Sequence, residues 1–176
     1  MRILTVRETA WFNVDPEAIW QQVSLLEDWS RWCAGLNSAR WVRGEPWNSG
    51  SRFELKWQGA VSAPLAGGEL HQVEEVGFRN TGTGEPSLRP DKSEMDDGDG
   101  LWVRRICWKS GFGPFCSEGR MSFLEDGKGT LVEFVTHWQG WAALFNGGRR
   151  SKRCANYQRD WLASLRHSLE RVGSIG

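Results

Sequence analysis

The chain has 176 residues, of which 22 are basic and 22 acidic, so its formal net charge is zero. This balance argues against the positive field that non-specific nucleic-acid binding needs, and the length fits a single domain, residues 1–176, with its own core. No apolar run is long enough to cross a membrane and the start has no secretory-signal pattern, so a cytoplasmic protein is expected.

The N-terminal region predicts one strand followed by two short helices. Residues 4–14 are rich in β-branched and aromatic side chains and end at Asp15-Pro16, where Asp15 is suited to cap a helix and Pro16 to begin it. Apolar residues then recur three or four positions apart: Ile19, Trp20 and Val23 in a first helix, and Leu26, Trp29, Trp32 and Cys33 in a second that Gly35 ends. This spacing turns the three tryptophans toward a shared interior.

The hydrophobic period changes to two after residue 39, which predicts strands. Every second residue of 51–58 is apolar, so one face of that strand is expected to be buried, and a further strand is expected over 69–76. Residues 79–100 carry six acids, three bases and no large aromatic side chain, a composition that does not build a core. We expect residues 79–100 to form a mobile acidic loop inserted between strands.

Two hairpins are predicted next, the first with strands over 101–109 and 115–124. Its turn, Ser110-Gly111-Phe112-Gly113, suits type II′ geometry and pairs Trp108 with Phe115, Ile106 with Ser117, Arg104 with Gly119 and Trp102 with Met121. The glycine turn at 126–129 pairs Phe123 with Val132, Met121 with Phe134, Gly119 with Thr136 and Ser117 with Trp138. Both registers place the large apolar side chains on one common face.

The opposite face of these hairpins is expected to be polar. It holds Arg105, Glu118, Arg120, Glu133 and His137, with Glu118 opposite His137. A carboxylate beside a histidine is a common arrangement in acid–base catalysis. Because the register directs both side chains outward, a surface ion pair is favoured over a catalytic pair.

Residues 150–172 predict a long amphipathic helix. Its apolar stripe comprises Cys154, Tyr157, Trp161, Leu165, Leu169 and Val172. The polar side chains of Arg153, Gln158, Arg159, Arg166 and Glu170 are expected mostly on other faces. The helix is therefore an amphipathic cover for the sheet.

The cysteines are expected to be free thiols. Cys33, Cys107, Cys116 and Cys154 form no C-x-x-C pair and have no histidine at zinc-site spacing. No metal and no other cofactor is expected.

This order of elements resembles the helix-grip fold of the START-like (SRPBCC) superfamily. The segment VDPEAIWQQVSLLEDWSRWCAGLNSARWV is similar to the opening of the polyketide cyclase/dehydrase and lipid transport family, where a second aromatic-rich helix ends near a W-x-x-G-like turn, matched here by Trp32 and Gly35. The segment RICWKSGFGPFCSEGRMSFLEDGKGTLVEFVTHWQG is similar to the family's last two hairpins. The resemblance implies an α+β fold in which a curved antiparallel sheet wraps around a long C-terminal helix, with two short helices after the first strand.

The family also implies an apolar cavity between the sheet and the C-terminal helix for a lipid-, quinone- or polyketide-like molecule. The side chains expected to face it are those of Phe53, Leu55, Trp57, Trp102, Arg104, Ile106, Trp108, Phe115, Ser117, Met121, Phe123, Phe134, Thr136, Trp138, Tyr157 and Trp161. The alternative is that these side chains fill the space themselves, since the chain has 12 tryptophans.

Arg104 is the most informative of the inward residues. A guanidinium aimed into an apolar interior needs an anion, a carbonyl or an aromatic face. One hypothesis is that Arg104, helped by Ser117, Thr136 and Tyr157, holds the polar end of a ligand. The other is an internal salt bridge or stacking on Trp102.

Three functions follow from this pattern. The first is binding of a hydrophobic small molecule. The second is an enzyme of the cyclase or dehydratase type, in which Arg104 and Tyr157 donate hydrogen bonds to an enolate or carbonyl. The third is an interaction protein that has a filled core and acts through its surface.

A basic run opens the C-terminal helix. Arg149, Arg150, Lys152 and Arg153 are either a solvated face or a contact for an anionic partner such as a membrane surface, next to the apolar Trp141, Leu144 and Phe145.

Overall fold

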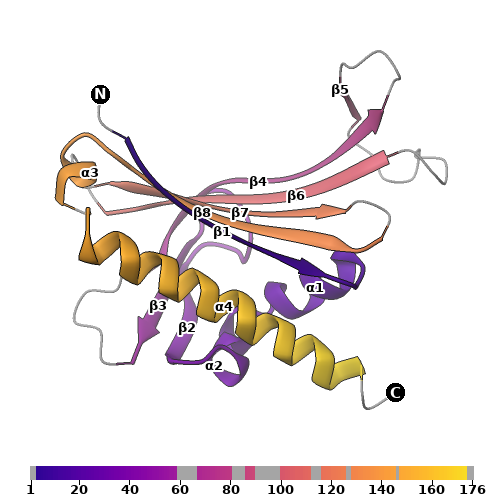
Figure 1. Cartoon of the computed structure of the whole chain (residues 1–176), viewed down its shortest axis with the longest axis horizontal. Helices are drawn as coiled ribbons and strands as arrows, with labels where there is room; N and C mark the ends of the chain where they lie inside the picture. The colour runs from indigo at the N-terminus through magenta and orange to yellow at the C-terminus, as the bar shows by residue number, and fades with distance from the viewer. Residues whose placement is uncertain are drawn as a thin grey trace.

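The computed structural model describes residues 3–58, 67–80, 86–89, 100–111, 116–125, 128–145 and 147–173, with the backbone alone at 74–80, 86–89, 100–103 and 172–173. Eight strands form one antiparallel sheet in the order β1-β8-β7-β6-β4-β3-β2, with β5 paired to β4 beside this path (Figure 1). The strands are β1 Ile3–Phe12, β2 Leu36–Arg43, β3 Arg52–Trp57, β4 Gly67–Asn80, β5 Pro86–Arg89, β6 Gly100–Ser110, β7 Ser117–Glu125 and β8 Thr130–Gln139.

Most of the helices lie on one side of this sheet, and α3 lies at one end of it (Figure 1). The helices are α1 Pro16–Ser24, the 3₁₀ turn η1 Leu26–Asp28, α2 Trp29–Trp32, α3 Trp141–Phe145 and α4 Arg149–Gly173. The sheet curves around α4, and α1 and α2 lie on that same side (Figure 1). The predicted α+β architecture with its long C-terminal helix is confirmed, whereas α3 was not predicted.

The start of α1 follows the predicted capping chemistry. Asp15 has extended backbone angles, and its Oδ1 accepts a hydrogen bond of 2.7 Å from the backbone N–H of Glu17. This bond satisfies one of the amide groups that have no partner within the helix. Pro16 occupies the first helical turn, where its missing N–H costs nothing.

The last hairpin has the predicted register, and the one before it does not. Strand β7 pairs with β8 as expected, including Met121 with Phe134 and Gly119 with Thr136. On β6, however, Ile106 pairs with Met121, Trp108 with Gly119 and Arg104 with Phe123. The register is displaced because Ser110 pairs with Ser117, which leaves 111–116 as a longer connection than the predicted two-residue turn. Residues 112–115 lie outside the described residues.

The predicted insertion over 79–100 contains regular structure. Strand β4 continues to Asn80, β6 begins at Gly100, and Pro86–Arg89 pairs with Gly77–Asn80 as β5. The prediction of a loop was wrong for these paired positions, because backbone pairing with β4 does not require the aromatic residues whose absence the prediction used. The predicted mobility of the insertion stays a prediction. Residues 81–85 and 90–99 lie outside the described residues.

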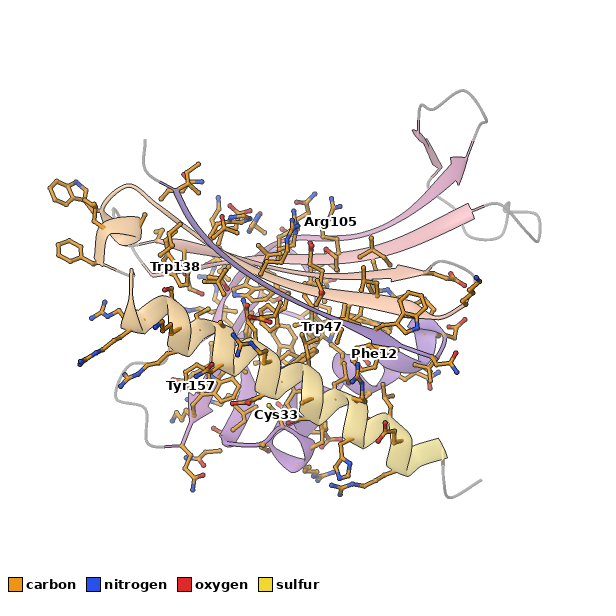
Figure 2. All side chains as sticks on the ribbon, in the orientation of Figure 1. Phe12, Cys33, Trp47, Arg105, Trp138 and Tyr157 are labelled. Carbon is orange, nitrogen blue, oxygen red and sulfur yellow. The ribbon has the colours of Figure 1, made fainter. Side chains whose placement is uncertain are left out.

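The two faces of the sheet differ in chemistry as the period of two requires. Figure 2 shows Arg105 on the side of the sheet away from α4, with Phe12, Trp47 and Cys33 below the sheet. On the outer face Glu133 forms two ion pairs. Its Oε2 lies 3.0 Å from Arg7 Nε, and its Oε1 lies 2.8 Å from Arg120 Nη2. No helix in the described part of the chain is both long and apolar enough to span a membrane.

One residue of α4 lies on a different face from the one predicted. Cys154, Trp161 and Leu165 are buried as expected, but Gln158 is also fully buried. Position 158 lies four residues after 154 and three before 161, so helical spacing places it within the buried stripe. Its polar side chain led the prediction to the wrong face.

Candidate functional site

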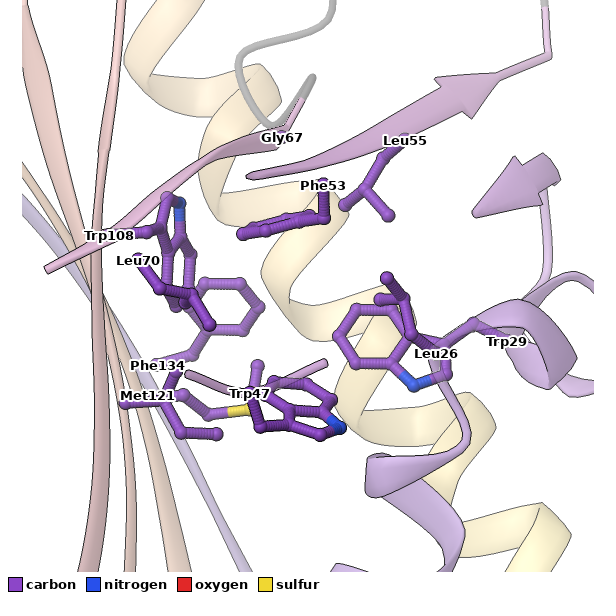
Figure 3. Close-up of a pocket in the computed structure, with 11 residues that line it drawn as sticks. Leu26, Trp29, Trp47, Phe53, Leu55, Gly67, Leu70, Trp108, Met121 and Phe134 are labelled. Carbon is purple, nitrogen blue, oxygen red and sulfur yellow. The ribbon is translucent and has the colours of Figure 1, made fainter. Parts of the chain in front are cut away.

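An apolar pocket lies on the concave side of the sheet (Figure 3). Strands β6, β7 and β8 form one wall, and β3 and the short helices form the facing wall. Its lining residues are Leu26, Trp29, Trp47, Phe53, Leu55, Gly67, Leu70, Ile106, Trp108, Met121 and Phe134. All eleven are apolar or glycine. None comes from α4, so this pocket differs in position from the predicted cavity between the sheet and the C-terminal helix.

Strand register assembles one wall of the pocket. Ile106, Met121 and Phe134 are consecutive partners across β6, β7 and β8, so their side chains form a row on the inner face. Phe53 and Leu55 alternate inward on β3 and form the facing wall (Figure 3). The apolar alternation that predicted these strands also predicts which side chains meet.

Two indole groups attach the pocket to the end of α1. The last carbonyls of a helix have no partner within it. Here Trp29 Nε1 donates to the Val23 carbonyl at 2.8 Å and Trp47 Nε1 to the Ser24 carbonyl at 2.7 Å. Both tryptophans therefore line the pocket while hydrogen-bonded to the C-terminal turn of α1.

Aromatic contacts continue around the pocket. Their ring centroids are 5.0–6.0 Å apart, in the sequence Trp47, Trp41, Phe53, Trp108, Phe134, Trp161 and Trp29. All six pairs meet edge to face, the arrangement that the aromatic quadrupole favours. The cavity they enclose is about 20 Å³, little more than one water molecule requires.

Six of the predicted site residues line this pocket: Phe53, Leu55, Ile106, Trp108, Met121 and Phe134. The others whose side chains the structure describes are outside its lining: Trp57, Arg104, Ser117, Phe123, Thr136, Trp138, Tyr157 and Trp161. The side chain of Trp102 and all of Phe115 lie outside the described residues. The predicted cavity lining did not include Leu26, Trp29, Trp47, Gly67 and Leu70. Helical spacing directs Leu26 and Trp29 inward, whereas Trp47 lies in a connection where no periodicity assigns a face.

Arg104 forms internal contacts with α1. Its Nη2 lies 3.3 Å from Glu17 Oε2, and its guanidinium carbon lies 4.4 Å from the centroid of the Trp20 ring. The side chain is 16% exposed, so both contacts are partly shielded from water. The aromatic partner is Trp20 rather than the predicted Trp102, and the residue opposite Arg104 is Phe123 rather than Gly119.

The polar pair predicted on the outer face is not formed. Glu118 and His137 are opposite each other in register, as expected. Glu118 Oε1 instead lies 3.5 Å from His71 Nε2, and His137 Nδ1 shares a 2.9 Å hydrogen bond with Thr5 Oγ1. The insertion of one extra residue in β4 between Leu70 and Gln72 brings His71 to this position.

A buried polar cluster lies between α4 and β8. Gln158 Nε2 donates to Thr136 Oγ1 at 3.0 Å, and both residues are almost completely buried. Among the described residues, neither Gln158 Oε1 nor the indole N–H of Trp161 has a hydrogen-bond partner. Each buried atom left in this state costs about 1–3 kcal/mol of stability.

The buried thiols are unreactive in character. Burial raises the pKa of Cys33 to about 12 and that of Cys154 to about 11, because a thiolate is poorly solvated in the core. All four cysteines are free, as predicted. Within the described ranges, no three His, Cys, Asp or Glu side chains are grouped as metal ligands would be.

No protein-family model matches the sequence, and no curated protein is similar to it in sequence. Solved structures share its fold. The chain matches the protein TTHA0849 from Thermus thermophilus with a TM-score of 0.54 at 16% identity, over 96% of this chain and 99% of that one.

Two further solved structures carry functional names. The STAR-related lipid transfer protein fragment from Xanthomonas axonopodis has a TM-score of 0.54 at 12% identity, over 94% of this chain and 85% of that one. The Zhui aromatase/cyclase from Streptomyces sp. R1128 has a TM-score of 0.52 at 11% identity, over 97% of this chain and 95% of that one. The chain therefore has the START-like helix-grip fold, and the resemblance predicted from the sequence is confirmed for the fold.

Proposed function

We propose that the protein binds a small hydrophobic molecule in the pocket between the sheet, β3 and the short helices. The observation that carries the proposal is the continuous apolar lining, which gathers side chains from η1, α2, five strands and the β2–β3 connection around one point on the concave face. Small-molecule sites are typically concave and mostly apolar. The neighbours named as a lipid transfer protein and an aromatase/cyclase share the fold and agree with this general class of ligand, although the fold itself does not determine function.

Binding requires the pocket to enlarge, and Trp47 is the residue best placed to move. It lies in the connection between β2 and β3, where its neighbours are exposed. Its φ of 61° is a left-handed conformation that costs a non-glycine residue of order 1–3 kcal/mol. The hydrogen bond to Ser24 and the edge contacts with Trp20 and Trp41 hold it inward. A ligand that replaces these ring contacts would allow the backbone strain to relax.

Substituting Leu55→Phe is expected to weaken ligand binding at least about tenfold, or about 1.4 kcal/mol. Leu55 projects into the pocket, so the added ring occupies space that the ligand needs (Figure 3). Titration with 2-methylnaphthalene, followed by intrinsic fluorescence, measures the effect because Trp29, Trp47 and Trp108 line the pocket.

The matched control is Val42→Phe, which adds a ring at an exposed position of the neighbouring strand, 45% accessible to solvent. It should bind the probe as the wild type does. Equal weakening in both variants, or none in either, would contradict the proposed location. A wild-type protein that takes up no probe would instead support the interaction protein with a filled core.

The cyclase or dehydratase alternative gains no specific support from the site. Its proposed donors were Arg104 and Tyr157. Arg104 is paired with Glu17 and lies over Trp20, and Tyr157 packs on Trp57 with ring centroids 4.7 Å apart. Neither side chain lines the pocket.

We also propose that the protein contacts anionic membranes through the end of the molecule formed by α3 and the start of α4. Trp141, Leu144 and Phe145 are 60%, 51% and 57% exposed, unusually high for large apolar side chains that are close together in one short helix. Helix α4 lies beside α3 (Figure 1). Its first turns carry four exposed cations, Arg149, Arg150, Lys152 and Arg153. Exposed aromatic and basic groups together suit the headgroup region of an anionic bilayer.

Flotation with vesicles tests this contact. Wild-type protein should float with vesicles that contain phosphatidylserine and much less with phosphatidylcholine alone, with recovery falling as salt rises. The double variant Arg149→Glu/Arg150→Glu should lose the preference. The control Arg43→Glu/Arg52→Glu makes the same charge change on exposed positions of β2 and β3 and should keep it. Recovery that is independent of lipid charge would refute the contact.

A further inference from the structure

Gln158 presents an unsatisfied acceptor inside the fold. The residue is 0% exposed, and only its Nε2 is hydrogen-bonded, to Thr136 Oγ1. Thr136 also forms a hydrogen bond with the thiol of Cys154, so its one hydroxyl is shared between two partners. Gln158 Oε1 is left without a partner among the described residues.

Trp161 presents an unsatisfied donor on the same helix face. It is 1% exposed, and its Nε1–H has no partner within the described part of the chain. Residues three apart on an α-helix lie on the same side, so Gln158 and Trp161 both face the sheet. This face of α4 therefore holds one unpaired acceptor and one unpaired donor a single turn apart.

This polar pair adjoins the apolar pocket. The Trp161 ring lies 5.7 Å from Phe134 and 5.3 Å from Trp29, measured between centroids, and both of these residues line the pocket. Thr136, the partner of Gln158, is two residues beyond Phe134 on the same face of β8. The Trp161 ring thus packs against the aromatic wall of the pocket, and Gln158 lies one helical turn from it on α4.

We propose that Gln158 and Trp161 form a hydroxyl subsite, and that the natural ligand is an apolar molecule bearing a neutral alcohol or phenol group. This inference rests on the proposed ligand-binding function. The hydroxyl donates to Gln158 Oε1 and accepts from Trp161 Nε1–H, so both buried atoms become satisfied.

Other polar groups fit this pair less well. A ketone or ether accepts from Trp161 but leaves Gln158 Oε1 unpaired. A carboxylate brings a charge into the core, where the guanidinium of Arg104 is already paired with Glu17. A hydroxyl supplies the required donor and acceptor in one uncharged group.

The test compares 2-naphthol with 2-methylnaphthalene, which have the same ring system and differ by a hydroxyl in place of a methyl group. Wild-type protein should bind 2-naphthol at least about tenfold more tightly, because the methyl analogue leaves two buried polar atoms unpaired. Gln158→Leu, which removes the acceptor, should abolish this preference. Trp161→Phe removes only the donor side and tests the same subsite should Gln158→Leu not fold.

The outcomes separate this inference from the proposed function. Equal affinity for the two probes in the wild type would overturn the subsite and leave the pocket proposal standing. A preference that persists in both variants would do the same. A wild-type protein that binds neither probe would overturn the ligand-binding function and the subsite together.

Discussion

Raising the pH from 8 to 10 is expected to lower the free energy of unfolding by about 3 kcal/mol through two buried thiols. Burial in the core is the main reason that the pKa of Cys33 rises from 9.0 to about 12, and the nearby Asp160 carboxylate adds to the shift. Burial likewise raises the pKa of Cys154 from 9.0 to about 11, against the opposing hydrogen bond from Thr136.

The direction of the effect follows from where the protons are held. Between the unfolded pKa of 9.0 and the folded values, the unfolded chain releases both thiol protons while the folded chain keeps them. The unfolded state therefore binds fewer protons, and stability falls as the pH rises. The contribution of the two thiols is complete below pH 9 and is lost progressively up to about pH 11–12.

Urea unfolding at pH 8, 9 and 10, in the presence of a phosphine reductant, measures the effect. The reference is the double variant Cys33→Ala/Cys154→Ala in the same series, because it keeps every other ionisable group of the chain. The wild type should lose about 3 kcal/mol more than the double variant between pH 8 and 10. Parallel losses in the two proteins would show that the thiols are not protected in the folded state.

The period of the apolar residues predicted the fold and the faces well, because burial itself imposes that period. Phe53 and Leu55 on β3, and Met121 and Phe134 on the last hairpin, point inward as expected. The cap at Asp15 was predictable for an equally local reason, the need of the first amide groups of a helix for an acceptor.

The register of β6 against β7 was less predictable. The displacement from the predicted pairing is four residues, and an even displacement keeps every side chain on its face. The hydrophobic pattern is therefore the same for both registers. Only the length of the connection distinguishes the two registers. Gly111 does not decide this length, because its positive φ of 87° occurs in turns of several types.

The missed parts of the site share a different cause. Trp47 comes from a connection without periodicity, so nothing in the local pattern assigns it a direction. Gln158 has the spacing of a buried residue and the chemistry of an exposed one. Residues that break the agreement between pattern and chemistry are often functional, and spacing alone would have identified Gln158 as such a residue.

The corrected register makes Gly119 a sensitive position, and Gly119→Ala is expected to destabilise the protein by about 2–3 kcal/mol. Gly119 pairs with Trp108, whose indole lies across it. A Cβ at this position would overlap the ring atoms Cε2, Cζ2 and Nε1 of Trp108. The ring is held on its other sides by Phe53 and Phe134, at 5.8 Å and 5.7 Å, so it has little room to move.

A double-mutant cycle separates this overlap from the general effect of glycine in a strand. The backbone of Gly119 is not in the left-handed region, so alanine suits its conformation and should even be slightly favourable where space allows. In a Trp108→Leu background, where the smaller side chain removes the overlap, Gly119→Ala should therefore cost less than about 1 kcal/mol. The same penalty in both backgrounds, measured by urea unfolding, would show that the indole does not lie over Gly119.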